Sequence, residues 1–372
     1  MKYIGLLSMA LIIASCSQKE SYSDGIKKIS KEDFLISKNI EADTVPIKDY
    51  NLNWKIIVSD SFLIIQKKPF QLKGKQTFFS VYHKTKLDYL GGIGVKGEGP
   101  WHDEWSYIMQ SGQVLNKNGQ SLLWVYHNNY GFAALLNITQ TLLSNSPKPI
   151  IDTTIVVDAN QFAFTNLTKI NNNLISDTWM SDTPQSLLKT LNLKTKNIYY
   201  HPLTPTMQNI DVLPSEVISS LYTSSFKKHP KNGKIAQTMK LFNRINFFDD
   251  DLNLTKSIVD GENWKNEFYD AKEINIESNF FEGRIDGYNG LEVSDKFVFA
   301  LKIRKENQEN SELRVFDWQG NPAFLINIKN PISFSMSFDE DTNTLYALDS
   351  NNDLLLKFDL TVIIKEWQNS LK

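Results

Sequence analysis

The chain has 372 residues, with 40 lysines and arginines against 42 aspartates and glutamates and a formal net charge of −2. This balance lacks the basic excess with which proteins bind nucleic acid, so we expect no nucleic-acid partner. The hydrophobic content of 41% is that of a globular chain with ample material for a core, and the 22 Phe, 14 Tyr and 8 Trp residues favour strands.

The first fifteen residues have the pattern of a secretory signal. Lys2 precedes an apolar run over residues 3–14, which is too short to span a bilayer because a span needs about 20 residues. The segment ends in IASC (13–16), which resembles the lipobox of bacterial lipoproteins. We expect residues 1–15 to be a lipoprotein signal peptide and Cys16 to be lipidated. The alternatives are a soluble secreted protein or a cysteine that is merely buried.

Cys16 is also the only cysteine of the chain. The sequence therefore excludes an intramolecular disulfide and a cysteine-based metal site. A polar segment with mixed charges, SQKESYSDGIKKISKED (17–33), follows it and is typical of a flexible linker. We expect residues 16–45 to be the lipidated N-terminus and tether and residues 46–372 to be the folded domain. The lipid would hold the protein in the membrane of the bacterial cell envelope, with the outer membrane or cell surface favoured over the inner membrane.

From about Trp54 onward, short apolar or alternating runs are separated by polar turns. The runs have the length and composition of strands; they include FLIIQ (62–66), TFFSVYH (77–83), SLLWVYH (121–127), KFVFALKI (296–303), NTLYALD (343–349) and DLLLKFDL (353–360). Helical spacing is scarce, and the best candidates for helices are residues 213–229 and 262–273. The rest of the sequence indicates an all-β fold.

A strand that ends in an aromatic or polar pair and runs into a tight turn recurs six times. The repeat positions are His83, Asn137, Leu193, Asp249, Asp317 and Asp359, with steps of 54, 56, 56, 68 and 42 residues. Blades of β-propellers repeat about every 40–50 residues, and the longest step contains the segment 262–273, as expected for an insertion in a loop. We therefore predict a six-bladed β-propeller of four-stranded antiparallel blades, because closing the ring buries both faces of each sheet and protects its edges. An open β-sandwich array or two smaller β domains are the alternatives.

The stretch LGGIGVKGEGPWHDEW (90–105) contains the G-x-G-x-x-G spacing of a dinucleotide site at residues 92–97. Gly99 and Pro100 follow, and they forbid the helix whose N-terminus would bind the pyrophosphate. We interpret Gly94, Gly97, Gly99 and Pro100 as an inter-blade loop, in which glycine permits positive φ and proline presets the exit of the turn.

These residues resemble a known family. IGVKGEGPWHDEW (93–105) is similar to the inter-blade loop of six-bladed propellers of the NHL and TolB-like type, and VFDWQGNP (315–322) with residues 337–360 is similar to the core of their repeat. With the lipobox, the chain resembles the TolB-like six-bladed propeller lipoproteins of Bacteroidetes over nearly its full mature length. The resemblance is weak in blades three and four, which have no glycine-rich loop. It implies the fold, but the family has no established biochemical activity.

The pentapeptide WHDEW is a candidate ligand-binding rim of the propeller; its residues are Trp101, His102, Asp103, Glu104 and Trp105. The aromatic rings would stack on a sugar ring or a peptide, and the carboxylates would accept hydrogen bonds. The alternative is that both tryptophans pack beneath the loop and the charged residues face solvent.

Metal and catalytic motifs are absent from the sequence. None of the five histidines forms a closely spaced pair of the kind that binds zinc, and there is no G-x-S-x-G nucleophile motif. FFDDDLN (247–253) and SFDEDTN (337–343) could bind calcium, but neither fits the EF-hand pattern, and acidic turns are common because Asp bonds its own backbone. We expect no catalytic residue, no metal site and no cofactor, with calcium as the alternative.

The leading hypothesis is a membrane-anchored, non-catalytic propeller lipoprotein that binds a protein, peptide or glycan partner in the cell envelope. Propellers present many loops around one axis, which suits recognition, although the fold itself does not dictate a function. A metal-dependent hydrolase or lyase of the lactonase or esterase propeller type is the first alternative, and it would need acids at the starts of the inner strands. A structural subunit of an envelope complex is the second alternative.

Overall fold

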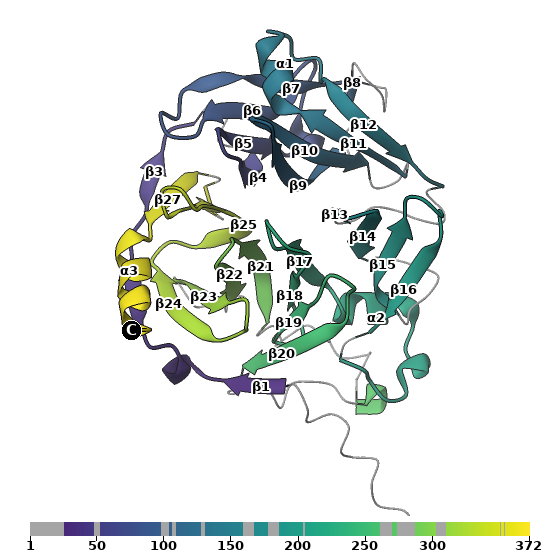
Figure 1. The fold of residues 1–372 in the computed structure, drawn as a ribbon, viewed down its shortest axis with the longest axis vertical. Helices are drawn as coiled ribbons and strands as arrows, with labels where there is room; N and C mark the ends of the chain where they lie inside the picture. The colour runs from purple at the N-terminus through teal and green to yellow at the C-terminus, as the bar shows by residue number, and fades with distance from the viewer. Residues whose placement is uncertain are drawn as a thin grey trace, which may run out of the picture.

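The computed structural model describes residues 26–47, 53–97, 104–105, 109–127, 131–158, 167–177, 186–203, 205–260, 270–273, 287–302, 310–349, 351–352 and 354–372. Their strands form six sheets that stand around a common axis, as Figure 1 shows. The chain is a six-bladed β-propeller, as the sequence predicts. The innermost strand of each blade faces the centre of the ring, and we number the blades in chain order from residue 53.

Each blade contains a meander of four antiparallel strands that follow one another from the axis outward. Blades 1 to 3 contain β4 (Asn53–Val58), β5 (Phe62–Lys67), β6 (Thr77–His83) and β7 (Tyr89–Lys96); β9 (Met109–Lys117), β10 (Gln120–His127), β11 (Phe132–Asn137) and β12 (Ile151–Val156); and β13 (Thr168–Ile170), β14 (Asn173–Asp177), β15 (Ser186–Asn192) and β16 (Ile198–Pro202). Blades 4 to 6 contain β17 (Ser224–Lys228), β18 (Ile235–Met239), β19 (Arg244–Phe248) and β20 (Leu254–Asp260); β21 (Tyr288–Val293), β22 (Phe297–Lys302), β23 (Ser311–Asp317) and β24 (Pro322–Ile328); and β25 (Ile332–Asp339), β26 (Thr344–Asp349), β27 (Leu355–Asp359) and β3 (Asp43–Val45).

Apolar side chains alternate along the central strands and face the two neighbouring blades. In β10, Leu123 and Val125 pack against blade 1, whereas Trp124 and Tyr126 pack against blade 3. The buried apolar residues of the described chain form six clusters, one at each junction between blades. Full burial of one Val, Leu or Phe side chain contributes about 1.5–3 kcal/mol, so these junctions hold the ring together.

The six positions of the sequence repeat lie at the end of the third strand of their blades or directly after it. The carboxylate of Asp249 accepts hydrogen bonds from the backbone N–H groups two and four residues ahead, at 3.0 and 2.8 Å, and Asp317 does the same at 2.9 and 2.8 Å. In blade 3, Asn192 has this role, one position before the Leu193 of the repeat. The repeat thus marks the side chain that fixes the turn from the third to the fourth strand.

Three blades carry a fifth strand that the sequence pattern does not predict. β1 (Ile26–Ile29) pairs parallel with β20 of blade 4, β2 (Ser37–Ile40) with β24 of blade 5, and β8 (Glu104–Trp105) with β7 of blade 1. A parallel strand on an outer edge occupies backbone groups that would otherwise be unpaired. The blades are therefore four- or five-stranded and mostly antiparallel.

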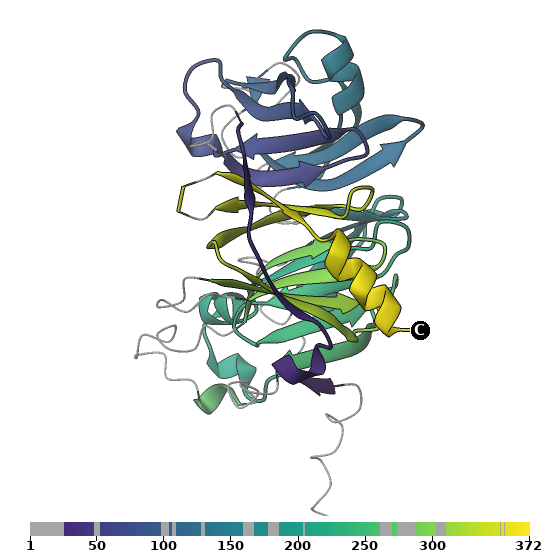
Figure 2. The same cartoon turned by 90° about the vertical axis from the view of Figure 1, so that its left-hand side faces the viewer.

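The N-terminal segment corrects the predicted boundary between tether and domain. The sequence pattern predicts a tether over residues 16–45, but residues 26–45 form β1, β2 and β3 along the outer edges of blades 4, 5 and 6. Figure 2 shows this segment crossing the side of the ring, near α3 (Thr361–Ser370). Its polar composition hides the strands because only one side chain of β1, Ile29, is buried. β3 pairs with β27 and so closes the ring with the two ends of the chain.

The other helices of the described residues are α1 (Ile138–Leu143) and α2 (Ser215–Leu221), with short 3-10 turns at Lys31–Asp33, Pro69–Gln71, Ile210–Val212 and Ala271–Glu273. α2 covers only the first half of the helix predicted over residues 213–229, because the second half enters β17 to pack Phe226 in the junction with blade 3. The helix predicted over 262–273 lies mostly outside the described residues. Among the described helices, none has both the length and the apolar character required to cross a bilayer.

Candidate functional site

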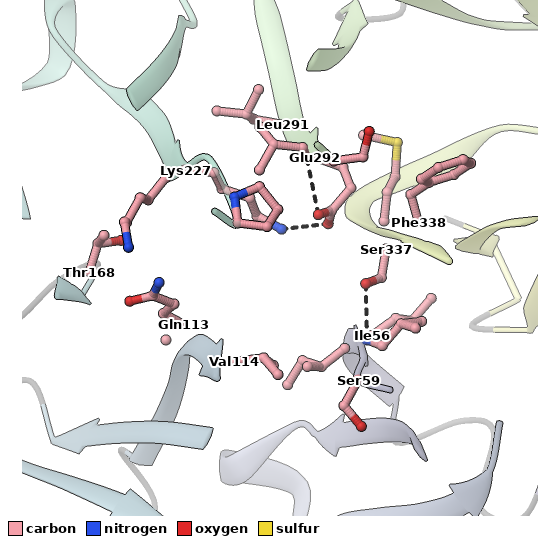
Figure 3. A pocket seen from close by; sticks show the side chains of 18 of the residues that line it. Ile56, Ser59, Gln113, Val114, Thr168, Lys227, Leu291, Glu292, Ser337 and Phe338 are labelled. Carbon is pink, nitrogen blue, oxygen red and sulfur yellow. Dashed lines mark hydrogen bonds and ion pairs between the residues drawn. The ribbon is translucent and has the colours of Figure 1, made fainter. Parts of the chain in front are cut away.

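The inner strands of all six blades enclose a cavity of about 820 Å³ on the propeller axis. Figure 3 looks into it and shows Ile56, Gln113, Thr168, Lys227 and Glu292, from five different blades, around one space. Successive side chains of each inner strand point to opposite faces of its blade, and polar as well as apolar ones contribute to the lining. Pockets that bind small ligands have volumes of about 300–1,000 Å³, so this cavity has the size of a binding site.

Side chains of one inner strand bond the backbone of the next and fix the width of the cavity. Ser335 and Ser337 of β25 accept hydrogen bonds from the N–H groups of Ile56 and Val58, at 2.8 and 3.0 Å. On the other side, Gln113 Oε1 accepts from the N–H of Lys169 at 3.2 Å. These bonds join blade 6 to blade 1 and blade 2 to blade 3. The inner strands are therefore held at defined positions before any ligand binds.

Two of the inner strands, β21 and β25, approach each other closely at Gly290. A Cβ atom on Gly290 would lie 2.8 Å from the carbonyl oxygen of Phe334. Since real Cβ atoms do not approach a backbone oxygen so closely, only glycine allows these two strands to converge on the axis.

The charged groups of the cavity are divided between its two sides. Blade 4 contributes Lys227, Lys228 and Lys231, whereas blades 5 and 6 contribute five acids, namely Glu292, Asp295, Asp339, Glu340 and Asp341. Blade 1 adds Lys55, Asp60 and Lys84. The cavity therefore has a basic side next to an acidic side.

Ion pairs join neighbouring blades around the cavity. The ammonium of Lys84, which is buried, lies 2.9 Å from Asp339 and 2.7 Å from Asp341, and so links blade 1 to blade 6. Burial lowers the pKa of Lys84, but the hydrogen bonds with Asp341 and Asp339 outweigh it and raise the pKa above its ordinary value. Between blades 4 and 5, Lys227 pairs with Glu292 and Lys231 with Asp295. These three lysines therefore link neighbouring blades around the cavity.

Lys228 differs from these lysines. It is half-buried at the end of β17 and lines the cavity, yet it has no acceptor within hydrogen-bond or ion-pair distance among the described residues. Burial lowers its pKa, and the positive charge of Lys169 lowers it further. The cavity therefore contains one ammonium group that the described part of the protein does not neutralise.

The glycine-rich stretch belongs to a strand. Residues 89–96 form β7, the fourth strand of blade 1, and the next described segments are also strands. The glycines therefore do not open a helix, in agreement with the rejection of a dinucleotide site. Of the predicted inter-blade loop, Gly94 lies inside β7, and Gly97 follows the strand and donates its N–H to the carbonyl of Trp105 at 3.0 Å. Gly94 is thus part of the fourth strand of blade 1, and Gly99 and Pro100 lie outside the described residues.

Trp105 explains why residue 94 is glycine. Gly94 has φ of +73°, and a Cβ atom there would collide with the indole ring of Trp105. The ring is only 1% exposed and packs edge-on against Phe78 and Phe79, with centroids 5.9 and 6.1 Å away. This position matches the alternative in which the tryptophan packs beneath the loop, and it leaves no face of Trp105 for a ligand.

The structure does not describe the side chains of Cys16 or of most residues of the predicted ligand rim. Cys16, Trp101, His102 and Asp103 lie outside the described residues, and for Glu104 only its backbone position in β8 is described. The hypothesis of a ligand rim at these residues stays a prediction.

The carboxylates of the two acidic turns contact the protein itself. Asp249 caps its own turn, and Asp339 and Asp341 pair with Lys84. Within the described residues, no three His, Cys, Asp or Glu side chains form a group that could hold a metal ion. The prediction on calcium remains untested.

Two of the described histidines lie at strand ends, as expected. His83 ends β6, and its Nδ1 accepts the N–H groups of Thr85 and Lys86, both at 3.3 Å. His127 ends β10 but is completely buried, and burial lowers its pKa to about 4. His127 is therefore neutral at pH 7.

The residues of the cavity have only a weak signal in the sequence, and the prediction of the site missed them. The first strand of blade 6, ISFSMSFD of β25, alternates polar and apolar residues, whereas SSFKK of β17 has one apolar residue among polar ones. The cavity residues are spread along the chain from residue 55 to residue 341, because each blade supplies one strand to the axis.

Comparison with known proteins identifies related folds. A model of the family described as TolB-like 6-blade propeller-like matches residues 33–341. Among solved structures, a member of the DUF4221 family from Bacteroides vulgatus superposes with a TM-score of 0.51 at 9% identity, covering 86% of this chain and 97% of that one. Hydrazine synthase from Kuenenia stuttgartiensis gives a TM-score of 0.46 at 9% identity, with 86% and 80% coverage. No curated protein sequence matches the chain.

Proposed function

We propose a binding function for this chain, which belongs to the TolB-like 6-blade propeller family. Its partner is a protein, peptide or glycan of the cell envelope, and the contact is made at the axial cavity and the face at which the cavity opens. The observation that supports this proposal is the cavity itself, which is about 820 Å³ in volume and is lined by all six blades. Its mixture of apolar and polar lining is that of sites that bind and orient a ligand.

We further propose that Cys16 is lipidated and anchors the propeller in the membrane. The tether would be shorter than the sequence suggested. Since β1 begins at Ile26, only the ten residues 16–25 remain for it. At 3.3–3.6 Å per residue, ten residues reach at most about 35 Å. The propeller would therefore stay close to the membrane with the edge of blade 4, where β1 lies, nearest to the anchor.

A metal-dependent hydrolase or lyase is the second hypothesis, and it requires acids on several inner strands directed at the axis. In the described residues, the cavity acids of blades 5 and 6 lie on one side of the channel, and Glu292 is engaged by Lys227. This arrangement favours binding over catalysis. Metal analysis of the purified protein discriminates the two: a stoichiometric divalent ion would favour the enzyme.

The anchoring proposal is tested by Cys16→Ala in the full chain. The variant should fold but remain unprocessed or unanchored, and a carbonate wash of the membranes should release it. Retention of the variant with washed membranes at the level of the wild type would contradict lipid anchoring at Cys16.

The binding site is tested by filling the cavity. Ser225 lies on β17, lines the cavity and is half-buried, so Ser225→Trp places a bulky ring in the channel. Affinity purification of the lipidated protein from membranes should recover a partner with the wild type and with the matched outer-edge variant Tyr199→Trp. The Ser225→Trp variant should lose that partner; equal recovery would show that the axial cavity is not the contact.

A further inference from the structure

Lys228 is half-buried and has no counterion among the described residues. Three other lysines of the cavity, Lys84, Lys227 and Lys231, each contact a carboxylate of a neighbouring blade. Lys228 points toward the junction with blade 3 instead, since it alternates with Lys227 along β17 and shares its face with Phe226. Five of the six acids of the cavity lie in blades 5 and 6, on the other side of β17, and the sixth, Asp60, belongs to blade 1.

A second positive charge, on Lys169, makes burial of the Lys228 ammonium more unfavourable. Lys169 of β13 is close enough for its positive charge to act on Lys228, and its own ammonium donates to the carbonyl of Asn171 at 2.5 Å. The carbonyl of Asn171 has no net charge, so this hydrogen bond leaves the positive charge of Lys169 unbalanced. Burying a cation without a counterion is unfavourable, and proteins accept the cost mainly where a partner supplies the opposite charge.

Neutral donors and an apolar side chain line the cavity on blades 2 and 3, and blade 3 is the neighbour that Lys228 faces. Figure 3 shows Thr168 and Gln113 on the same side of the cavity, across from Glu292 and Ser337. Gln113 uses its carboxamide oxygen for the Lys169 N–H, which leaves its amide nitrogen as a donor. Val114, near Gln113 in the same view, adds an apolar wall.

We infer that the axial cavity binds an organic ligand through one oxyanion group, a carboxylate or a phosphate, which pairs with Lys228 between blades 3 and 4. Thr168 and Gln113 donate further hydrogen bonds to the oxyanion, and an apolar part of the ligand lies against Val114. An ammonium with neutral donors around it is a common arrangement for an oxyanion, because charge-assisted hydrogen bonds are stronger than neutral ones. The inference rests on the proposed binding function and names the chemistry of the ligand.

The first experiment measures the reactivity of Lys228 in the full-length protein. Acetic anhydride acylates unprotonated amines, and mass spectrometry reports the rate for each lysine. The probes are N-acetyl-leucine, its uncharged amide N-acetyl-leucinamide, and hexyl phosphate. We expect an anionic probe to slow acylation of Lys228 severalfold and the amide to have no effect; the stronger of the two anions identifies carboxylate or phosphate as the source.

The second experiment measures the affinity of the effective probe for matched variants. Lys228→Gln should weaken binding about tenfold or more, because it removes a charge-assisted hydrogen bond. Lys228→Arg should retain binding. Lys234→Gln removes the same charge at an exposed position in the turn between β17 and β18 and should leave the affinity unchanged.

Several results would overturn the inference. If neither anionic probe protects Lys228 at millimolar concentration, if the amide protects equally well, or if Lys228→Gln binds like the wild type, then Lys228 is only a solvated amine. Different results would refute the proposed binding at the axial cavity. Loss of the envelope partner in Ser225→Trp but not in Lys228→Gln would keep the axial site and refute the oxyanion, whereas retention of the partner in Ser225→Trp would refute the axial site itself.

Discussion

The outer edges of blades 4, 5 and 6 differ from those of blades 2 and 3. The N-terminal segment runs along the first group, as β1, β2 and β3, and in blade 5 the covered strand β24 is largely buried. In blades 2 and 3 the outer strands β12 and β16 are the last of their sheets, and most of their residues are half-exposed or exposed. The ring is therefore reinforced where it closes, whereas the edges of blades 2 and 3 remain open to solvent.

Removal of the N-terminal strands should damage the fold more than any other change. A chain that starts at residue 48 lacks Ile29, Phe34 and Val45, which are 2%, 5% and 4% exposed and pack in the junctions of blades 4, 5, 6 and 1. Their burial alone is worth about 5–9 kcal/mol at 1.5–3 kcal/mol each, which is comparable to the whole stability of a typical domain. We expect this chain to be unfolded or aggregated by circular dichroism and thermal denaturation.

The matched control starts at residue 26 and retains all three strands. It should unfold at the same temperature as the mature protein. Equal stability of the two truncated chains would show that the N-terminal strands are dispensable for closure.

A smaller loss of stability is expected from a substitution in blade 1, whose edge is covered by β8 instead of the N-terminal segment. Gly94→Ala places a methyl group against the Trp105 ring at a φ of +73°, whereas Gly119→Ala has φ of +72° but no atom within 4 Å of the new methyl group. Overpacking costs about 1–3 kcal/mol and left-handed backbone about 1–2 kcal/mol. Urea denaturation should therefore show a loss of about 3–4 kcal/mol for Gly94→Ala and about 1 kcal/mol for Gly119→Ala. Equal losses would mean that Trp105 does not fill the space above Gly94.

A pH effect of slightly smaller size is expected on the open side of the ring, from His127 of blade 2. Burial lowers the pKa of His127 to about 4, against about 6.5 in an unfolded chain. Above pH 6.5 both states are neutral; between pH 6.5 and 4 only the unfolded state binds the proton, so the free energy of unfolding falls by about 3 kcal/mol as the pH decreases. His127→Gln should flatten this part of the stability profile, and profiles that run parallel would contradict the assignment.

The mildest change is expected at the open edge of blade 3. Tyr199 lies on β16 and is 53% exposed. Substitutions at such surface positions usually change stability by less than about 0.5 kcal/mol, and threonine keeps the preference for strand. Tyr199→Thr should leave the melting temperature within about 2 °C of the wild type. A larger loss would indicate that the edge of blade 3 is covered in solution.

The blade pattern was predictable because local chemistry sets it. Asp249 and Asp317 sit where a turn needs a carboxylate to accept backbone N–H groups, so a repeated turn leaves a repeated residue. The covering strands were not predictable in this way. β1 buries only Ile29, so it has the composition of a linker, and its partner β20 lies more than two hundred residues away in the chain.

Less of the candidate site than of the fold could be predicted from the sequence. Local sequence indicated the glycine-rich stretch, but it could not show that Trp105 folds back over Gly94, because that contact depends on the parallel pairing of β8 with β7. Lys228 falls in a segment whose spacing indicated a helix. Its position on the axis follows only once β17 becomes the inner strand of blade 4.

The use of residues 43–45 as the outer strand of the last blade affects the order in which the chain folds. Val45 pairs with Leu355, and β1 and β2 pair with strands of blades 4 and 5. During synthesis the first part of the domain to be made thus waits unpaired until its late partners exist, and joining such distant segments costs chain entropy and slows the final step. Refolding should accordingly show a slow last phase in which protection of the β3 amides from hydrogen exchange arises together with that of β27.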